Sequence, residues 1–177
     1  MYHDTRGGQL RDGGLLYLRW TLPERPIPVL LGSWGPKTIR AAAGLVAEVK
    51  LGGSANPDVA AWLRRYLTEL DQPNAGVVIG AVTVVDEDGA AARALARREV
   101  ALYLPVVATL DPTLTIEPER LARIKAAADS YDYETAASHI SDALLARFAF
   151  AGTPADIIAQ SEALFAAGAP RIEFGTP

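Results

Sequence analysis

Short apolar runs that end near glycine alternate with helical patterns along most of this chain. Residues 28–32 and 77–85 leave little room for a solvated face, which predicts strands buried on both sides. Two shorter strands are expected at 48–52 and 171–175. An apolar stripe at helical spacing predicts that a helix follows the second strand; it consists of Val59, Trp62, Leu63, Tyr66, Leu67 and Leu70.

The remaining helices are expected after Thr38 to about Ala47 and at 90–104, 118–129, 141–148 and 154–167, with a loop from about Pro105 to Pro112. Asn56-Pro57 and Thr153-Pro154 each combine a capping side chain with proline at the first helical position. Strands that alternate with helices at this spacing build a parallel sheet with right-handed crossovers. We therefore expect an α/β fold in one domain, with an irregular lead-in at 1–27, a short strand at 15–20, and a helical insertion at 105–150.

Composition narrows the class of protein. Half of the 177 residues are apolar and 21% are charged, which favours a folded domain with a real core. The absence of cysteine and the presence of only two histidines exclude a disulfide scaffold and a cysteine- or histidine-rich metal site. The net charge of −4 argues against a nucleic-acid partner, and no apolar run approaches the roughly 20 residues of a membrane helix. The N-terminus does not read as a signal peptide, so a cytoplasmic protein is expected.

The first candidate site follows the first buried strand. It consists of Gly32, Ser33, Trp34, Gly35, Pro36, Lys37 and Thr38 and leads into a helix. Free backbone N–H groups and the helix dipole make such a turn suited to phosphate, and Gly35 lets an anion approach the backbone closely. The alternative is a tight strand-to-helix turn that simply requires glycine.

The second candidate site, Gly52-Gly53-Ser54, follows the next strand. Adjacent parallel strands present their carboxyl ends to the same ligand, so the two glycine-rich turns support each other. Turn chemistry alone is again the alternative, and Asn56 is better explained as a helix cap. Glu173 lies in the last strand, where alternation leaves open which face of the sheet it joins.

Four motifs in a fixed order resemble the luciferase-like monooxygenase superfamily. They are Ile27 to Lys37, Lys50 to Pro57, Val82 to Asp88 with its Ala-Arg helix, and Phe150 to Pro154 with Arg171 to Gly175. The resemblance covers about residues 20–177 and is strongest to the deazaflavin-dependent branch, similar to methylenetetrahydromethanopterin reductase.

The resemblance implies a parallel (β/α) TIM-type barrel that binds coenzyme F420, or alternatively FMN, at the carboxyl ends of its strands. It implies cofactor phosphate at Ser33 to Pro36 and a pocket wall at Gly52 to Ser54. Such barrels need about 250 residues, so the four strands expected here correspond to strands five to eight. The chain is then a C-terminal half, and the resemblance carries over no catalytic acid or base.

Two functions follow as expectations. One is an oxidoreductase, incomplete as this chain, that transfers hydride between the cofactor and a small-molecule substrate, or a monooxygenase in the FMN branch. The other is a non-catalytic half-barrel that binds a second copy or a complementary half-barrel chain. Uncovered strand edges beside an apolar inner face would favour such pairing.

Overall fold

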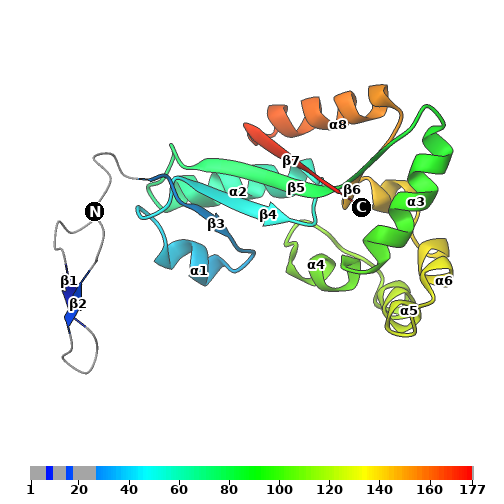
Figure 1. Cartoon of the computed structure of the whole chain (residues 1–177), viewed down its shortest axis with the longest axis horizontal. Helices are drawn as coiled ribbons and strands as arrows, with labels where there is room; N and C mark the ends of the chain where they lie inside the picture. The colour runs from blue at the N-terminus through cyan, green and yellow to red at the C-terminus, as the bar shows by residue number, and fades with distance from the viewer. Residues whose placement is uncertain (1–6, 10–14, 18–26, 177) are drawn as a thin grey trace.

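The computed structural model describes residues 7–9, 15–17 and 27–176 and contains two sheets (Figure 1). In the small one, β1 (Gly7–Gln9) pairs antiparallel with β2 (Leu15–Tyr17). The large one holds five parallel strands. They are β3 (Leu30–Gly32), β4 (Glu48–Gly52), β5 (Gly76–Val85), β6 (Ala149–Gly152) and β7 (Arg171–Gly175). The expected parallel α/β architecture is confirmed.

β5 is the centre of the large sheet. Its first half pairs with β4, its middle with β7 and its last four residues with β6. Val82 pairs with β6 and β7 at once, and Ile79 pairs with β4 and β7. A strand has only two edges, so β4 and β6 share one edge of β5 and β7 takes the other. β3 extends the sheet beyond β4.

Two cores lie on opposite faces of the sheet. Helices α1 (Pro36–Ala41), α2 (Pro57–Glu69) and α8 (Pro154–Ala166) contribute to the first. Its fully buried members include Val49, Leu51, Val59, Leu63, Val77, Ile79, Phe150 and Leu164. The second core joins Val82 and Val84, which point the other way, to the remaining helices. These are α3 (Gly89–Ala101), α4 (Leu104–Leu110), α5 (Pro118–Asp129), α6 (Tyr133–Ser138) and α7 (Asp142–Leu145).

The structure corrects several expected elements. Residues 104–110 form α4 where a loop was expected, because Pro105 occupies the first turn of a helix, where it costs no hydrogen bond. The insertion expected at 105–150 ends in a strand, β6, so the sheet has five parallel strands rather than four. α1 ends at Ala41 rather than Ala47, and Gly44, at φ +77°, lies in the turn that follows. In the predicted 15–20 strand, 15–17 is strand and 18–20 lies outside the described residues, as does most of the lead-in.

Both expected helix caps are present. The Asn56 side chain accepts from the Asp58 amide, and Thr153 forms a capping box with Asp156. The hydrogen bond from the Thr153 amide, and then that from its hydroxyl, lower the pKa of Asp156. Across the described ranges, the helices lack the length and apolarity needed to cross a membrane.

Candidate functional site

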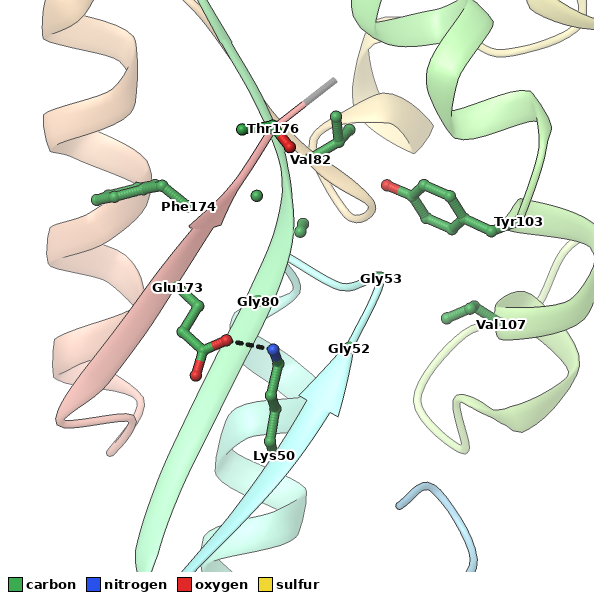
Figure 2. Close-up of a pocket in the computed structure, with 12 residues that line it drawn as sticks. Lys50, Gly52, Gly53, Gly80, Val82, Tyr103, Val107, Glu173, Phe174 and Thr176 are labelled. Atoms are coloured by element: carbon green, nitrogen blue, oxygen red, sulfur yellow. Dashed lines mark hydrogen bonds and ion pairs between the residues drawn. The ribbon is translucent and has the colours of Figure 1, made fainter. Parts of the chain in front are cut away.

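A hollow of about 470 Å³ opens where β4 ends, between the middle of β5, the end of β7 and the junction of α3 and α4 (Figure 2). Its size is typical of small-molecule sites. The lining is dominated by glycine and apolar residues, with few polar groups. It consists of Lys50, Gly52, Gly53, Gly80, Ala81, Val82, Tyr103, Val107, Glu173, Phe174, Gly175 and Thr176.

One wall is the sheet face that carries Lys50 and Glu173, here called the inner face. Strand alternation places Glu48, Lys50 and Gly52 of β4 on this face, while Val49 and Leu51 point into the first core. Glu173 of β7 also points into the hollow. Glu173 thus lies on the same face of the sheet as Lys50, which the sequence alone did not determine.

The inner face combines apolar and charged side chains, because Val78 and Val82 of β5 lie on the same face as Lys50 of β4. The Lys50 ammonium pairs with Glu173 Oε2 across the central strand. Arg171 Nη2 lies 2.8 Å from Glu48 Oε2 and 3.6 Å from Glu173 Oε1. The inner face is thus apolar only in part, because four charged side chains of β4 and β7 form a neutral set beside the valines of β5.

Glycines in β5 make room for these charges. A Cβ built on Gly80 would lie 3.2 Å from both Lys50 Cε and Glu173 Cβ, and one built on Gly76 would lie 2.8 Å from Glu48 Cγ. A larger residue at either position would force the charged side chains of the neighbouring strands to shift. The two glycines therefore allow side chains from β4 and β7 to meet over the strand between them.

The opposite wall of the hollow is formed by Tyr103 and Val107. Gly53 adopts φ +74°, and a Cβ there would lie 3.1 Å from each of these side chains, so the turn requires glycine. The Tyr103 hydroxyl donates to the Phe148 carbonyl at 2.6 Å. Burial raises the pKa of Tyr103 well above its ordinary value, so the phenol stays protonated and keeps this hydrogen bond.

The β3–α1 turn lies outside this hollow but is joined to it. Trp34 Nε1 donates to the Gly52 carbonyl at 3.0 Å, and the Ser33 amide donates to the Lys50 carbonyl at 3.1 Å. The Gly35 amide donates to Ser33 Oγ, and Pro36 has no N–H. Among the described residues, the backbone amides of Trp34, Lys37 and Thr38 are the donors of this turn that remain for an anion.

The second predicted motif is divided by the fold. Gly52 and Gly53 line the hollow, whereas the side chain of Ser54 is buried beneath it. Ser54 Oγ accepts from the Asn56 amide at 3.2 Å, and the Ser54 amide donates to the Gly80 carbonyl at 3.1 Å. Ser54 therefore holds the turn that carries the two glycines.

Sequence reasoning did not select Lys50, Gly80, Tyr103 or Val107 for the site. One signal was present: Gly76 and Gly80 lie an even number of residues apart in a strand, so both mark the same face. Glycine in a strand interior often marks the close approach of another group, here the charged side chains of the inner face. No comparable signal exists for Tyr103, whose place in the hollow depends on how α3 packs.

The sequence was compared with models of known protein families. The family described as luciferase-like monooxygenase matches residues 16–171. The chain belongs to the luciferase-like monooxygenase family. The resemblance of its four motifs to this family is thereby confirmed.

Solved structures of similar fold are about twice as long as this chain. One is the coenzyme F420-dependent tetrahydromethanopterin reductase from Methanopyrus kandleri, at TM-score 0.72 and 21% identity, covering 85% of this chain and 45% of that one. Another is an F420-dependent secondary alcohol dehydrogenase in complex with an F420-acetone adduct, at TM-score 0.62 and 15% identity, covering 96% of this chain and 50% of that one. This luciferase-like chain thus has the fold of about half of each enzyme.

Proposed function

We propose that this chain is the cofactor-binding half of an oxidoreductase that uses coenzyme F420, with FMN as the alternative cofactor. The observation that supports the proposal most directly is the glycine-lined hollow at the strand ends of a luciferase-like chain. Ligands of parallel α/β barrels bind at this end of the strands. The F420-dependent enzymes of similar fold favour F420 over FMN.

The residues of the hollow fit a planar ring. A Cβ built on Gly52 would meet nothing within 4 Å, so backbone there borders open space. Gly53 and Gly80 add further wall without side chains, and Tyr103 and Val107 form the opposite side. When bound, the ring itself would carry the hydride exchanged with an organic substrate. The chain's own contribution is to hold and orient that ring, and we assign it no catalytic acid or base.

The first prediction concerns the hollow. F420 added to the purified chain should bind, and Gly52→Val should weaken binding about tenfold or more, since the new side chain fills ligand space. Fluorescence titration with F420 and with FMN measures both the affinity and the cofactor preference. Val106→Phe, on the exposed face of α4 beside Val107, adds bulk outside the hollow and should leave the affinity unchanged. Equal affinity in the Gly52→Val chain would contradict the assignment.

The second prediction concerns the phosphate. We infer that the β3–α1 turn, from Ser33 to Thr38, contacts the cofactor phosphate, with Lys37 adding positive charge. Gly35→Val should cost about 1–3 kcal/mol of F420 binding through exclusion of the anion and lost hydrogen bonds. Gly35 has φ −78°, which any residue can adopt, and a Cβ there would lie 3.3 Å from Thr38 Oγ1, so the backbone should tolerate the change with a small shift of the Thr38 side chain. The same variant should bind 5-deazariboflavin, which lacks the phosphate, as the natural chain does. Loss of binding to both ligands would instead indicate general damage.

A second candidate function is a binding or structural module, which the open sheet favours. Among the described residues, β3 pairs only with β4 and β7 only with β5. Either edge is available to a second copy of the chain or to a complementary half-barrel. Under either function, the isolated chain should show little or no turnover, because part of the pocket wall would come from the partner.

A further inference from the structure

The hollow contains few groups that could recognise a polar ligand. Its polar side chains are Lys50, Tyr103, Glu173 and Thr176, and the Tyr103 hydroxyl already donates to the Phe148 carbonyl. In a pocket otherwise lined by glycine and apolar residues, a small number of polar groups sets the orientation of the ligand. Lys50 and Glu173 are the charged members of this set.

The Lys50–Glu173 ion pair leaves donors and acceptors of both side chains free to bind a ligand. Lysine carries three N–H donors, of which one serves Glu173, and a carboxylate offers about four acceptor sites, of which one receives Lys50. Both side chains are partly exposed, and both point into the hollow. The pair therefore presents a donor and an acceptor side by side to whatever occupies the space above Gly80.

The pair is also held in position. Gly80 lies beneath it, where a Cβ would come within 3.2 Å of both side chains, and Arg171 lies beside the second oxygen of Glu173. Arg171 is held in turn by Glu48. A supported pair loses little conformational freedom when a ligand binds, which favours specific recognition.

We propose that Lys50 and Glu173 recognise a neutral ligand edge that carries a carbonyl beside an N–H group, as in a cyclic imide. Lys50 donates to the carbonyl and Glu173 accepts from the N–H. The pyrimidine ring of a deazaflavin or a flavin has such an edge, at C4=O and N3–H. An anionic group is a poorer occupant, because it would meet the Glu173 carboxylate where it meets Lys50. The identification of the ligand as a deazaflavin or flavin ring rests on the proposed function.

The test compares two ligands that differ by one methyl group and carry no phosphate. 5-Deazariboflavin and its N3-methyl derivative are titrated into the purified chain, with ligand fluorescence as the readout. Methylation removes the N–H group that donates to the charged Glu173 carboxylate. Because a hydrogen bond to a charged group is lost, the affinity of the derivative should be lower by about a factor of ten or more. Equal binding of the two ligands overturns the proposal while leaving the proposed function standing. Binding of neither ligand overturns both.

Variants assign the effect to the pair. Glu173→Leu should bind both ligands equally and weakly, because the acceptor is gone. The matched control is Glu134→Leu, which breaks the exposed Arg98–Glu134 ion pair far from the hollow and should keep the discrimination. Persistent discrimination in Glu173→Leu contradicts the assignment. The affinity for inorganic phosphate is measured in the same way. If the Glu173→Gln variant binds phosphate more tightly than the natural chain does, Lys50 belongs to an anion site, and the assignment is contradicted.

Discussion

Phe150→Ala should destabilise the fold by about 3–5 kcal/mol. Phe150 lies in β6, is fully buried in the first core, and packs edge-to-face on Phe174 with ring centroids 5.2 Å apart. Its removal would leave a cavity between the sheet and α8, which cannot close readily because β6 is held to β5 by hydrogen bonds. Chemical denaturation followed by circular dichroism measures the change in unfolding free energy.

Phe174 supplies the matched control for this prediction. Phe174→Ala breaks the same aromatic pair, worth about 0.5–1.5 kcal/mol, but its side chain is 55% exposed and leaves no closed cavity. The difference in the loss of unfolding free energy between the two variants therefore measures the effect of burying the Phe150 side chain. Equal losses would mean that β6 does not enter the core in solution as the structure shows.

Self-association of the isolated chain is the second large effect, and it should be visible as at least twice the monomer mass in light scattering at micromolar concentration. Among the residues that the structure describes, the outer edges of β3 and β7 are unpaired, and both carry exposed apolar side chains. Ile27, Val29 and Leu30 lie at the β3 edge, and Phe174 lies on β7. Unpaired strand edges with such flanks pair readily with another chain.

Charges placed on the edges should reverse this association. Leu30→Lys on β3 and Phe174→Lys on β7 should each shift the chain toward monomer, because burying lysine in a new strand pair is costly. Leu95→Lys, on the exposed face of α3 away from both edges, should leave the measured mass unchanged. A natural chain that is already a monomer would show that these edges do not recruit a partner.

Local sequence patterns were sufficient for most of the elements. The bounds of α5 agree with the prediction, those of α8 agree to within one residue, and α2 begins at the predicted Pro57. A capping side chain before proline marks the start of α2 and of α8. β5 was equally readable, since a ten-residue run without charge fits only a buried strand. β6 was missed because Ala-Phe-Ala-Gly is too short and too poor in β-branched residues to be distinguished from the end of a helix.

For the candidate site too, the sequence predicted some features and the tertiary structure determined the others. By itself, the sequence determined that glycine-rich turns follow two successive parallel strands, because turn chemistry and strand order are local properties. Tertiary structure alone decided that Gly52 and Gly53 line a hollow while Ser54 is buried beneath it. It alone brought Lys50 to Glu173, which lies 123 residues away in the chain. Such a meeting depends on which strands flank β5 and on glycine at position 80, and no local pattern contains that information, because strand neighbours are chosen by the packing of the whole sheet.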